Sequence, residues 1–449
     1  MTTSDSSPQP TAADERAAGR TQRRRAPRRA LSQLATSGRD PLGILAAQNE
    51  TRLPDLVPLR AERMAASAFA FYRGTAALMA ADLAAGPSSG IQVASCGDAH
   101  VANFGFYASP QRTLVFDLND FDEAAWAPWE WDVKRLVASI VVAGQATARD
   151  DAVTRDAAEA AVRQYATALR QGQLAPPIER YYQHFDAAGG LRSGSKDARR
   201  TLRAAIASAQ KRTGEKATRK LTVLGEDGRR RFVEEPPTMT HIGPELEARV
   251  TSSLHEYLAT TRADIRLLVS HYTATDTVRR VVGVGSVGTR CYVTVLVARD
   301  GSALLMQTKE AGRSVLVEYG GCPQSPEITE FVAQTGEGGR VVALQRILQG
   351  VSDPLLGHFR GTSHDYYVRQ FRDMKGGIDA ETLDDATFRL YAKACAAVLA
   401  RAHGQSPTAG QVVGYIGDAK AVTEAIVEWS YAYAALSRAD YDAFVAAAG

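Results

Sequence analysis

"VRRVVGVGSVGTRCYVTVLVARDGSALLMQTKEA", residues 278–311, decides the fold class of the sheet-forming part of this chain. Apolar and β-branched residues alternate on both sides of a Gly-rich turn, and a second turn follows at "ARDGS". Such alternation is typical of strands, and the turn residues join neighbouring strands. The stretch predicts antiparallel strands in a unit of residues 276–372. A helix in "GRVVALQRILQG" and strands in "PLLGHFRG" and "DYYVRQF" complete this unit.

The Gly-rich turn has two interpretations. Gly283, Gly285 and Gly288 fit the pattern G-x-G-x-x-G, but strand-like residues follow where a dinucleotide-binding unit would begin a helix. An ordinary hairpin with glycines at positive φ explains the turn. It is also explained by a nucleotide-binding loop that includes Ser286 and whose backbone approaches the phosphates. Lys309, at the end of the next strand, favours the second interpretation because its ammonium can reach the α and β phosphates.

Helical periodicity flanks this unit on both sides. Apolar residues recur every three or four positions from residue 41 to Gly86, and "WDVKRLVASIVVAGQATA" predicts a buried helix. We expect a large helical part over 41–275 and further helices over 373–449 that complete it. Residues 1–40 are rich in Ser, Pro, Ala and Arg and predict a disordered basic arm.

A polar loop, "GDAHVANFGFY" (97–107), lies between two strand-like runs of the helical part. It holds Asp98, His100 and Asn103, and Asp117 and Asp120 follow soon after. Helix caps and turns explain any one of these residues. As a set they provide the groups that phosphoryl transfer needs, which are a carboxylate near the acceptor hydroxyl and oxygen ligands for magnesium.

These motifs resemble those of a known superfamily. "GDAHVANFGFY", "VFDLNDFDEAAW" and "WDVKRL" resemble the G-D-x-H-x-x-N, I-D-F/W-D and D-L-A-R-L motifs of aminoglycoside and choline phosphotransferases, relatives of protein kinases. From about residue 20 the chain also resembles the bacterial family called domain of unknown function 2252, in "RMAASAFAFYRG", "GVGSVGTRCYV", "DYYVRQFRDMKG" and "LARAHG". The resemblance implies an α+β, bilobal, kinase-like fold that uses ATP and magnesium to phosphorylate a hydroxyl of a small molecule.

The order of the motifs implies a circular permutation. A kinase chain runs from the Gly loop and the lysine to the catalytic loop, whereas here Asp98 precedes Gly283 and Lys309. "RLYAKACAAVLARAHG", near the end of the chain, would then lead into the strand before the polar loop. We expect His403 to lie beside Val93.

The resemblance also implies residue roles. Asp98 is the base or orients the acceptor, His100 is a further catalytic candidate, and Lys309 contacts the phosphates together with the Gly loop. Asn103 is a metal ligand, with either Asp117 or Asp120. The spacing of the phosphotransferase motifs, counted forward from Asn103, points to Asp117 as the second metal ligand. Counted back from Asp132 of "WDVKRL", it points to Asp120, which we prefer.

Two departures from the motifs of the resemblance leave the activity open: Cys96 stands where a His or Tyr usually precedes the catalytic G-D, and Lys309 has no evident acidic partner. Glu327 and Glu330 lie at a plausible distance to pair with Lys309, but the most helix-like segment offers Gln345 and Arg346 instead. A nucleotide-binding regulatory module, like a pseudokinase, is therefore the alternative to an enzyme. A metallophosphoesterase would need further His ligands after "GDAH", which the chain does not provide at the required spacing.

Composition narrows the class of protein. The net charge is +3, and the first 40 residues hold eight Arg against four acids, so the remaining chain carries −1 and does not favour nucleic-acid binding. The four Cys are far apart and are expected to be reduced, buried thiols. No apolar run is long enough to span a bilayer, and the N-terminus lacks the apolar core of a secretion signal, so we expect a cytoplasmic protein.

Overall fold

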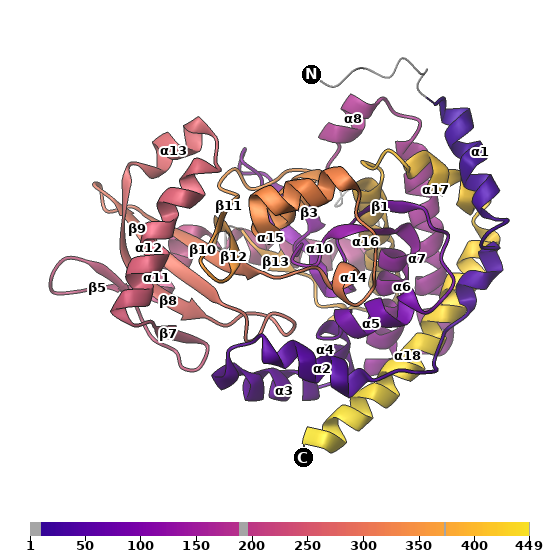
Figure 1. The fold of residues 1–449 in the computed structure, drawn as a ribbon, viewed down its shortest axis with the longest axis horizontal. Coiled ribbons are helices and arrows are strands. Elements are labelled where there is room, and N and C mark those ends of the chain that lie inside the picture. Colours follow the sequence, from indigo (N-terminus) through magenta and orange to yellow (C-terminus); the bar gives the residue numbers. More distant parts are fainter. Residues whose placement is uncertain (1–9, 188–195, 372–373, 449) are drawn as a thin grey trace.

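A computed structural model describes residues 10–187, 196–371 and 374–448. It is a mixed α+β structure in which a sheet-rich part lies beside a larger helical part (Figure 1). The predicted α+β class is therefore confirmed.

The sheet-rich part is built on one antiparallel sheet. Among the described residues this sheet has six strands in the order β11-β12-β10-β9-β8-β7. Their bounds are β7 Met239–His241, β8 Tyr272–Arg280, β9 Cys291–Ala298, β10 Ala303–Ala311, β11 Gly357–Arg360 and β12 Asp365–Gln370. The sheet thus begins before the predicted boundary at residue 276, because β8 pairs with β7, which lies in the segment that we expected to be helical.

The two faces of this sheet pack against different helices. Met306 on β10 packs with Tyr257 and Ile265, which come from α12 (Pro244–Ala259) and α13 (Ala263–Val269). The preceding residue, Leu305, packs instead with Leu221 at the end of α11 (Gly214–Leu221). Since successive side chains on a strand point to opposite faces, Gln307 and Lys309 share the face of Leu305.

The long helix α15 (Pro326–Leu348) packs along β11 and β12. It is interrupted at Gly336, where φ is 73° and a Cβ would lie 2.5 Å from an Asp365 carboxylate oxygen. That same oxygen accepts a 2.8 Å hydrogen bond from Glu337 N, which caps the second half of the helix. The predicted helix "GRVVALQRILQG" is this second half.

The core of the helical part surrounds α6 (Trp129–Ala146), whose apolar residues occupy almost every side, as the sequence predicts for a buried helix. α6 packs against three long helices: α7 (Asp151–Gly172), α16 (Asp385–His403) and α18 (Lys420–Ala448). Trp129 of α6 stacks on Tyr165 of α7 with a centroid distance of 5.7 Å. This core is rigid support for the polar loop, which lies beside it.

Two small sheets frame the polar loop. β1 (Gln92–Ser95) enters it and pairs with β4 (Ala125–Pro128), while β2 (Phe104–Ala108) leaves it and pairs with β3 (Leu114–Leu118) and β13 (Gly376–Gly377). Ala94 N donates a 2.9 Å hydrogen bond to Ser406 Oγ, just after α16. The expected adjacency of β1 and the end of α16 is therefore observed.

The N-terminal segment differs from the expected disordered arm. Residues 12–22 form α1 (Ala12–Gln22), which approaches α17 (Ala409–Ile416) so closely that a Cβ on Gly19 would meet Gln411 O at 1.9 Å. The guanidinium of Arg23 donates to the carbonyls of Gly414 and Tyr415, and that of Arg28 to the carbonyl of Ile416. These arginines satisfy the last carbonyls of a helix, which composition alone does not indicate.

The remaining elements connect the two parts. Helices from the first hundred residues lie in the lower half of Figure 1, where α3 and α4 contact α18: α2 Pro41–Glu50, α3 Val57–Ala65, α4 Ala68–Arg73 and α5 Ala76–Ala84. Others belong to the connections: α8 Pro177–Tyr182, α10 Lys196–Gln210, β5 Thr222–Leu224, β6 Arg230–Phe232 and α14 Val315–Glu318. In the described part of the chain no helix combines the length and the apolar character needed to cross a membrane.

Candidate functional site

The polar loop is held in place by a buried carboxylate of α6. Asp132 accepts hydrogen bonds from Cys96 N at 2.8 Å and Gly97 N at 3.1 Å. His403 Nε2 lies 3.2 Å from the same carboxylate and ties the end of α16 to this point. Gly97 has φ of 80°, and a Cβ there would lie 2.2 Å from Glu123 O. Glycine is therefore required where the polar loop meets the 120–123 segment.

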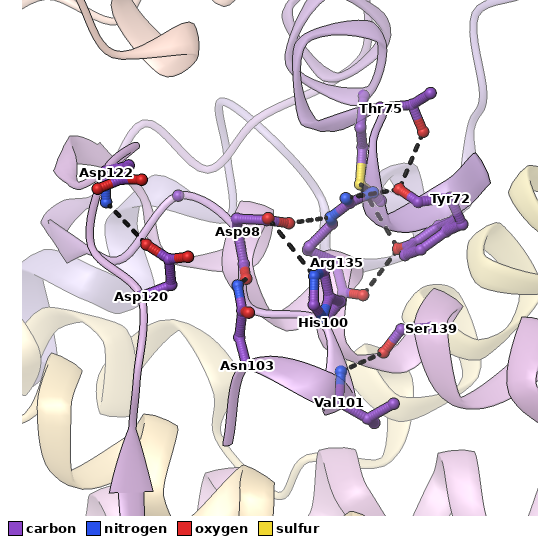
Figure 2. A network of polar contacts seen from close by, with 12 residues as sticks. Tyr72, Thr75, Asp98, His100, Val101, Asn103, Asp120, Asp122, Arg135 and Ser139 are labelled. Atoms are coloured by element: carbon purple, nitrogen blue, oxygen red, sulfur yellow. Dashed lines mark hydrogen bonds and ion pairs between the residues drawn. The ribbon is translucent and has the colours of Figure 1, made fainter. Parts of the chain in front are cut away.

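Asp98 points toward Arg135 and His100 (Figure 2). Arg135 Nε donates to Asp98 Oδ1 at 2.8 Å, and His100 Nε2 lies 3.6 Å from Oδ2. Burial lowers the pKa of His100 to about 4, so its imidazole is neutral at pH 7. Asn103 Nδ2 donates to the backbone carbonyl of Asp98 at 2.7 Å, which orients the Asn103 side chain.

Asp120 lies in a strongly positive environment just beyond the end of β3. Burial alone would raise its pKa, but the charges of Lys309, Arg369 and Lys375 outweigh burial and lower the pKa to about 2. The carboxylate is therefore ionised at any physiological pH. This combination of an anionic oxygen ligand and nearby cations suits a phosphate and its metal ion.

Lys309 has an acidic partner, but from an unexpected segment. Its Nζ lies 2.5 Å from Asp122 Oδ2, and Tyr367 OH donates to Asp122 Oδ1 at 2.5 Å. The Lys309 side chain is only 2% exposed; burial would lower its pKa, but the charge of Asp122 raises it well above its usual value. The acids suggested on α15, Glu327 and Glu330, do not fill this role.

Helix α15 instead contributes Arg340 to this region. Its guanidinium donates to the carbonyls of Asp122 at 2.9 Å and Gly312 at 2.8 Å. It also forms an ion pair with Glu337 one turn earlier. Arg340 therefore joins the 120–124 segment to the chain after β10, and thereby stabilises the position of the Lys309–Asp122 pair.

Asp117 lies elsewhere. Its Oδ2 accepts a 2.7 Å hydrogen bond from Gly350 N, and its Oδ1 accepts one of 2.8 Å from Leu118 N. Burial raises the pKa of this carboxyl, and the charge of Arg401 opposes the shift only in part. Asp117 thus connects β3 to the end of α15, whereas Asp120 borders the cavities described below.

The Gly-rich turn is anchored to the N-terminal helices. Leu53 N donates to Gly288 O at 2.8 Å, and Arg63 Nη1 donates to Gly283 O at 2.7 Å. Ser286 Oγ donates to the carbonyl of Val282 at 2.9 Å. Gly283 and Gly288 have φ of 71° and 91°, the left-handed conformation that glycine adopts readily. The turn is therefore held against α2 and α3.

Two cavities meet at this site. The smaller, about 570 Å³, is bordered by Asp98, His100, Asn103, Asp120 and the Gly-rich turn from Gly283 to Ser286. The larger, about 950 Å³, runs past Gln307, Arg369 and Phe371 of the sheet-rich part. Asn103 and Asp120 border both cavities. Segments far apart in the sequence therefore converge on one place.

Several contacts and residues of the site were not anticipated from the sequence. Asp122 belongs to the acidic run after β3, but its pairing with Lys309 has no local signal because the two residues meet across the sheet and the helical part. Arg52 and Arg73, which border the smaller cavity, lie in ordinary helical sequence. In the described part of the chain no group of three or more His, Cys, Asp or Glu side chains could hold a metal ion.

Comparison with known proteins identifies the family. No curated protein and no solved structure matches this chain. A family model matches residues 52–447, which include the polar loop, the Gly-rich turn and Lys309. The chain belongs to the family described as uncharacterized protein conserved in bacteria (DUF2252).

Proposed function

We propose that this protein transfers a phosphoryl group from magnesium-bound ATP to a hydroxyl of a small molecule, on a bilobal, circularly permuted kinase-like fold. One observation carries the proposal: the polar loop, the Asp120 segment and the Gly-rich turn border the same cavity, although the turn lies far along the chain. Lys309 pairs with Asp122, which borders this cavity.

The order of elements around the sheet supports the proposal. β8, the Gly-rich turn, β9, β10 with Lys309, and α15 follow one another as the Gly loop, the lysine strand and helix αC do in a kinase. α16 ends beside β1, which leads into the polar loop. This contact supplies the link that the permutation requires.

The side chains at the junction of the cavities fit a magnesium ion. Magnesium usually keeps several waters and takes one or two protein oxygens together with substrate phosphates. Asp120 and the amide oxygen of Asn103 would hold it, since Asn103 uses only its Nδ2 to bind the Asp98 carbonyl. When bound, the ion neutralises charge on the phosphates. Lys309, Arg369 and Lys375 would face the same groups, because all three act on Asp120.

The proposed reaction forms one bond to phosphorus, breaks another and leaves one proton for the site to accept. The acceptor oxygen forms a bond to the γ-phosphorus, the bond from that phosphorus to the β,γ-bridging oxygen breaks, and ADP leaves. The hydroxyl proton passes to a carboxylate oxygen of Asp98. Because Arg135 Nε already binds Oδ1 of this carboxylate, Oδ2 is the oxygen that would orient the hydroxyl.

A second candidate function is nucleotide binding without turnover. The Asp98–Arg135 ion pair favours it, because the guanidinium, at 2.8 Å, already occupies one oxygen of the carboxylate that would accept the hydroxyl proton. A regulatory module would keep the nucleotide site and lack transfer.

Thermal unfolding and ADP release test the proposal together. A ligand at about 100 times its dissociation constant stabilises a fold by roughly 2.7 kcal/mol, so Mg-ATP at millimolar concentration should raise the midpoint of unfolding. ADP release above the rate without protein, on addition of a panel of small alcohols, identifies the enzyme. Stabilisation without ADP release favours the regulatory module, and no stabilisation contradicts both.

A further inference from the structure

One wall of the smaller cavity consists of residues to which the proposed function gives no role in binding the nucleotide. Arg52, just after α2, and Arg73, at the end of α4, border it together with Asp98. Both side chains are partly buried. They come from the N-terminal helices, whereas the cations that act on Asp120 come from the sheet-rich part and the segment after it.

These two arginines lack carboxylate partners. In the part of the chain that the structure describes, no side-chain hydrogen bond or ion pair involves the Arg73 guanidinium, and its enclosed Nε has no acceptor. Arg52 donates to the carbonyl of Val287, while its enclosed Nε also lacks an acceptor. By contrast, Arg39, which is also partly buried, binds both Asp82 and Asp440. Burying a guanidinium without an anion is costly, so a ligand anion would stabilise both residues.

Three acids around the same cavity are paired with other cations, and in the described part of the chain no ion pair joins the remaining acids, Glu50, Asp120, Glu123 and Glu318, to Arg52 or Arg73. Asp98 is bound by Arg135, and Asp122 by Lys309. Glu310 is bound by Arg290 at 3.1 Å. No protein carboxylate in the described residues therefore occupies the guanidinium groups of the N-terminal wall.

The pKa directions agree with this geometry. Burial lowers the pKa of Arg73, and the charges of Asp98, Glu381 and Asp379 compensate only in part. Burial also lowers the pKa of Arg52 despite Glu123 and Glu310. The Asp98 partner Arg135 shows the opposite shift: burial would lower its pKa, but Asp98 raises it.

We propose that Arg52 and Arg73 form an anion subsite for the acceptor, so that the acceptor is a small alcohol that also carries a phosphate or carboxylate group. The inference rests on the proposed function for the role of the acceptor hydroxyl, which Asp98 orients beside this wall. Guanidinium groups bind both kinds of anion through charge-assisted hydrogen bonds. The competing assignment is that the arginines hold the γ-phosphate of the nucleotide.

Calorimetric titration distinguishes these assignments. Inorganic phosphate and, separately, acetate are titrated into the full chain, with and without a saturating non-hydrolysable ATP analogue and magnesium. We expect at least one of these anions to bind while the analogue is present, and at least tenfold more weakly to Arg52→Met and Arg73→Met. Arg73→Lys should retain part of the affinity, and Arg438→Met, an exposed arginine on α18, should be unchanged.

Each other outcome has a defined meaning. Displacement of the anion by the analogue would assign the arginines to the γ-phosphate and overturn the proposal. The proposal would also be overturned if neither anion bound. The same holds if both Met variants bound the anion as tightly as the wild type while their midpoints of thermal unfolding were unchanged. If the analogue does not bind but phosphate binds through Arg73, the nucleotide function fails while the anion subsite stands.

Discussion

Asp117 and Asp120 lie three positions apart in the sequence but have opposite environments. Asp117 accepts hydrogen bonds from two backbone N–H groups, and burial raises its pKa. Asp120 faces three cations, which lower its pKa to about 2 despite burial. One carboxyl therefore joins β3 to the end of α15, and the other is a fixed anion at the junction of two cavities. Chemistry at this site depends on what surrounds each carboxyl and not on how many carboxyls the segment contains.

The largest expected effect separates these two residues in catalysis. Under the proposed function, Asp120→Asn should lower magnesium-dependent ADP release by at least about 10³-fold, because it removes the anionic metal ligand. Asp117→Asn should stay within about tenfold of wild type and lower the midpoint of thermal unfolding. Steady-state rates over a magnesium titration measure both. If Asp117→Asn is inactive and Asp120→Asn keeps an unchanged magnesium requirement, the comparison is reversed.

The sequence predicts the elements better than it predicts this contrast. The strands around the Gly-rich turn, the buried helix α6 and the position of the polar loop all follow from periodicity and turn residues. Strand alternation separates Asp117 from Asp120, but every residue of β3 is buried, so alternation does not indicate which face meets a cavity. The Lys309–Asp122 pair and the packing of α1 on α17 depend on contacts between distant segments, and no local pattern reports such contacts.

Glu123 extends the comparison to a third carboxyl of the same segment. Burial raises its pKa from 4.5 to about 7, although Val315 N donates to it at 2.7 Å. Between these values the unfolded chain releases the proton while the folded chain retains it. Stability therefore falls as pH rises from about 4.5 to 7 and does not fall further above that range.

Glu123→Gln removes this titration and keeps a side-chain oxygen for Val315 N. The difference in unfolding free energy between the variant and wild type should grow, in favour of the variant, by at most about 3 kcal/mol from pH 4.5 to pH 7.5. Urea unfolding at a series of pH values measures it. Parallel pH profiles for the two proteins would show that Glu123 titrates normally.

Substitution of two buried lysines is expected to have a smaller effect, on the stabilisation by nucleotide. Lys309 pairs with Asp122 at the cavities, whereas Lys134 lies over the Trp429 ring in the helical core, where burial lowers its pKa to about 8. Lys309→Met should remove most of the roughly 2.7 kcal/mol of stabilisation expected from saturating Mg-ATP. Lys134→Met, the matched control, should retain it. An equal nucleotide-induced shift of the unfolding midpoint in wild type and Lys309→Met would exclude contact between this lysine and the phosphates.

Under the proposed function, Asp120 and Asn103 hold the metal of a bound nucleotide between the two cavities. Crystals of the full chain grown with Mn²⁺ and a non-hydrolysable ATP analogue test it, because Mn²⁺ is located directly by anomalous scattering. We expect an anomalous peak within coordinating distance of the Asp120 carboxylate and the Asn103 amide oxygen, with the analogue's phosphates beside Lys309. A peak at Asp117, or a bound analogue whose metal touches neither Asp120 nor Asn103, would contradict it.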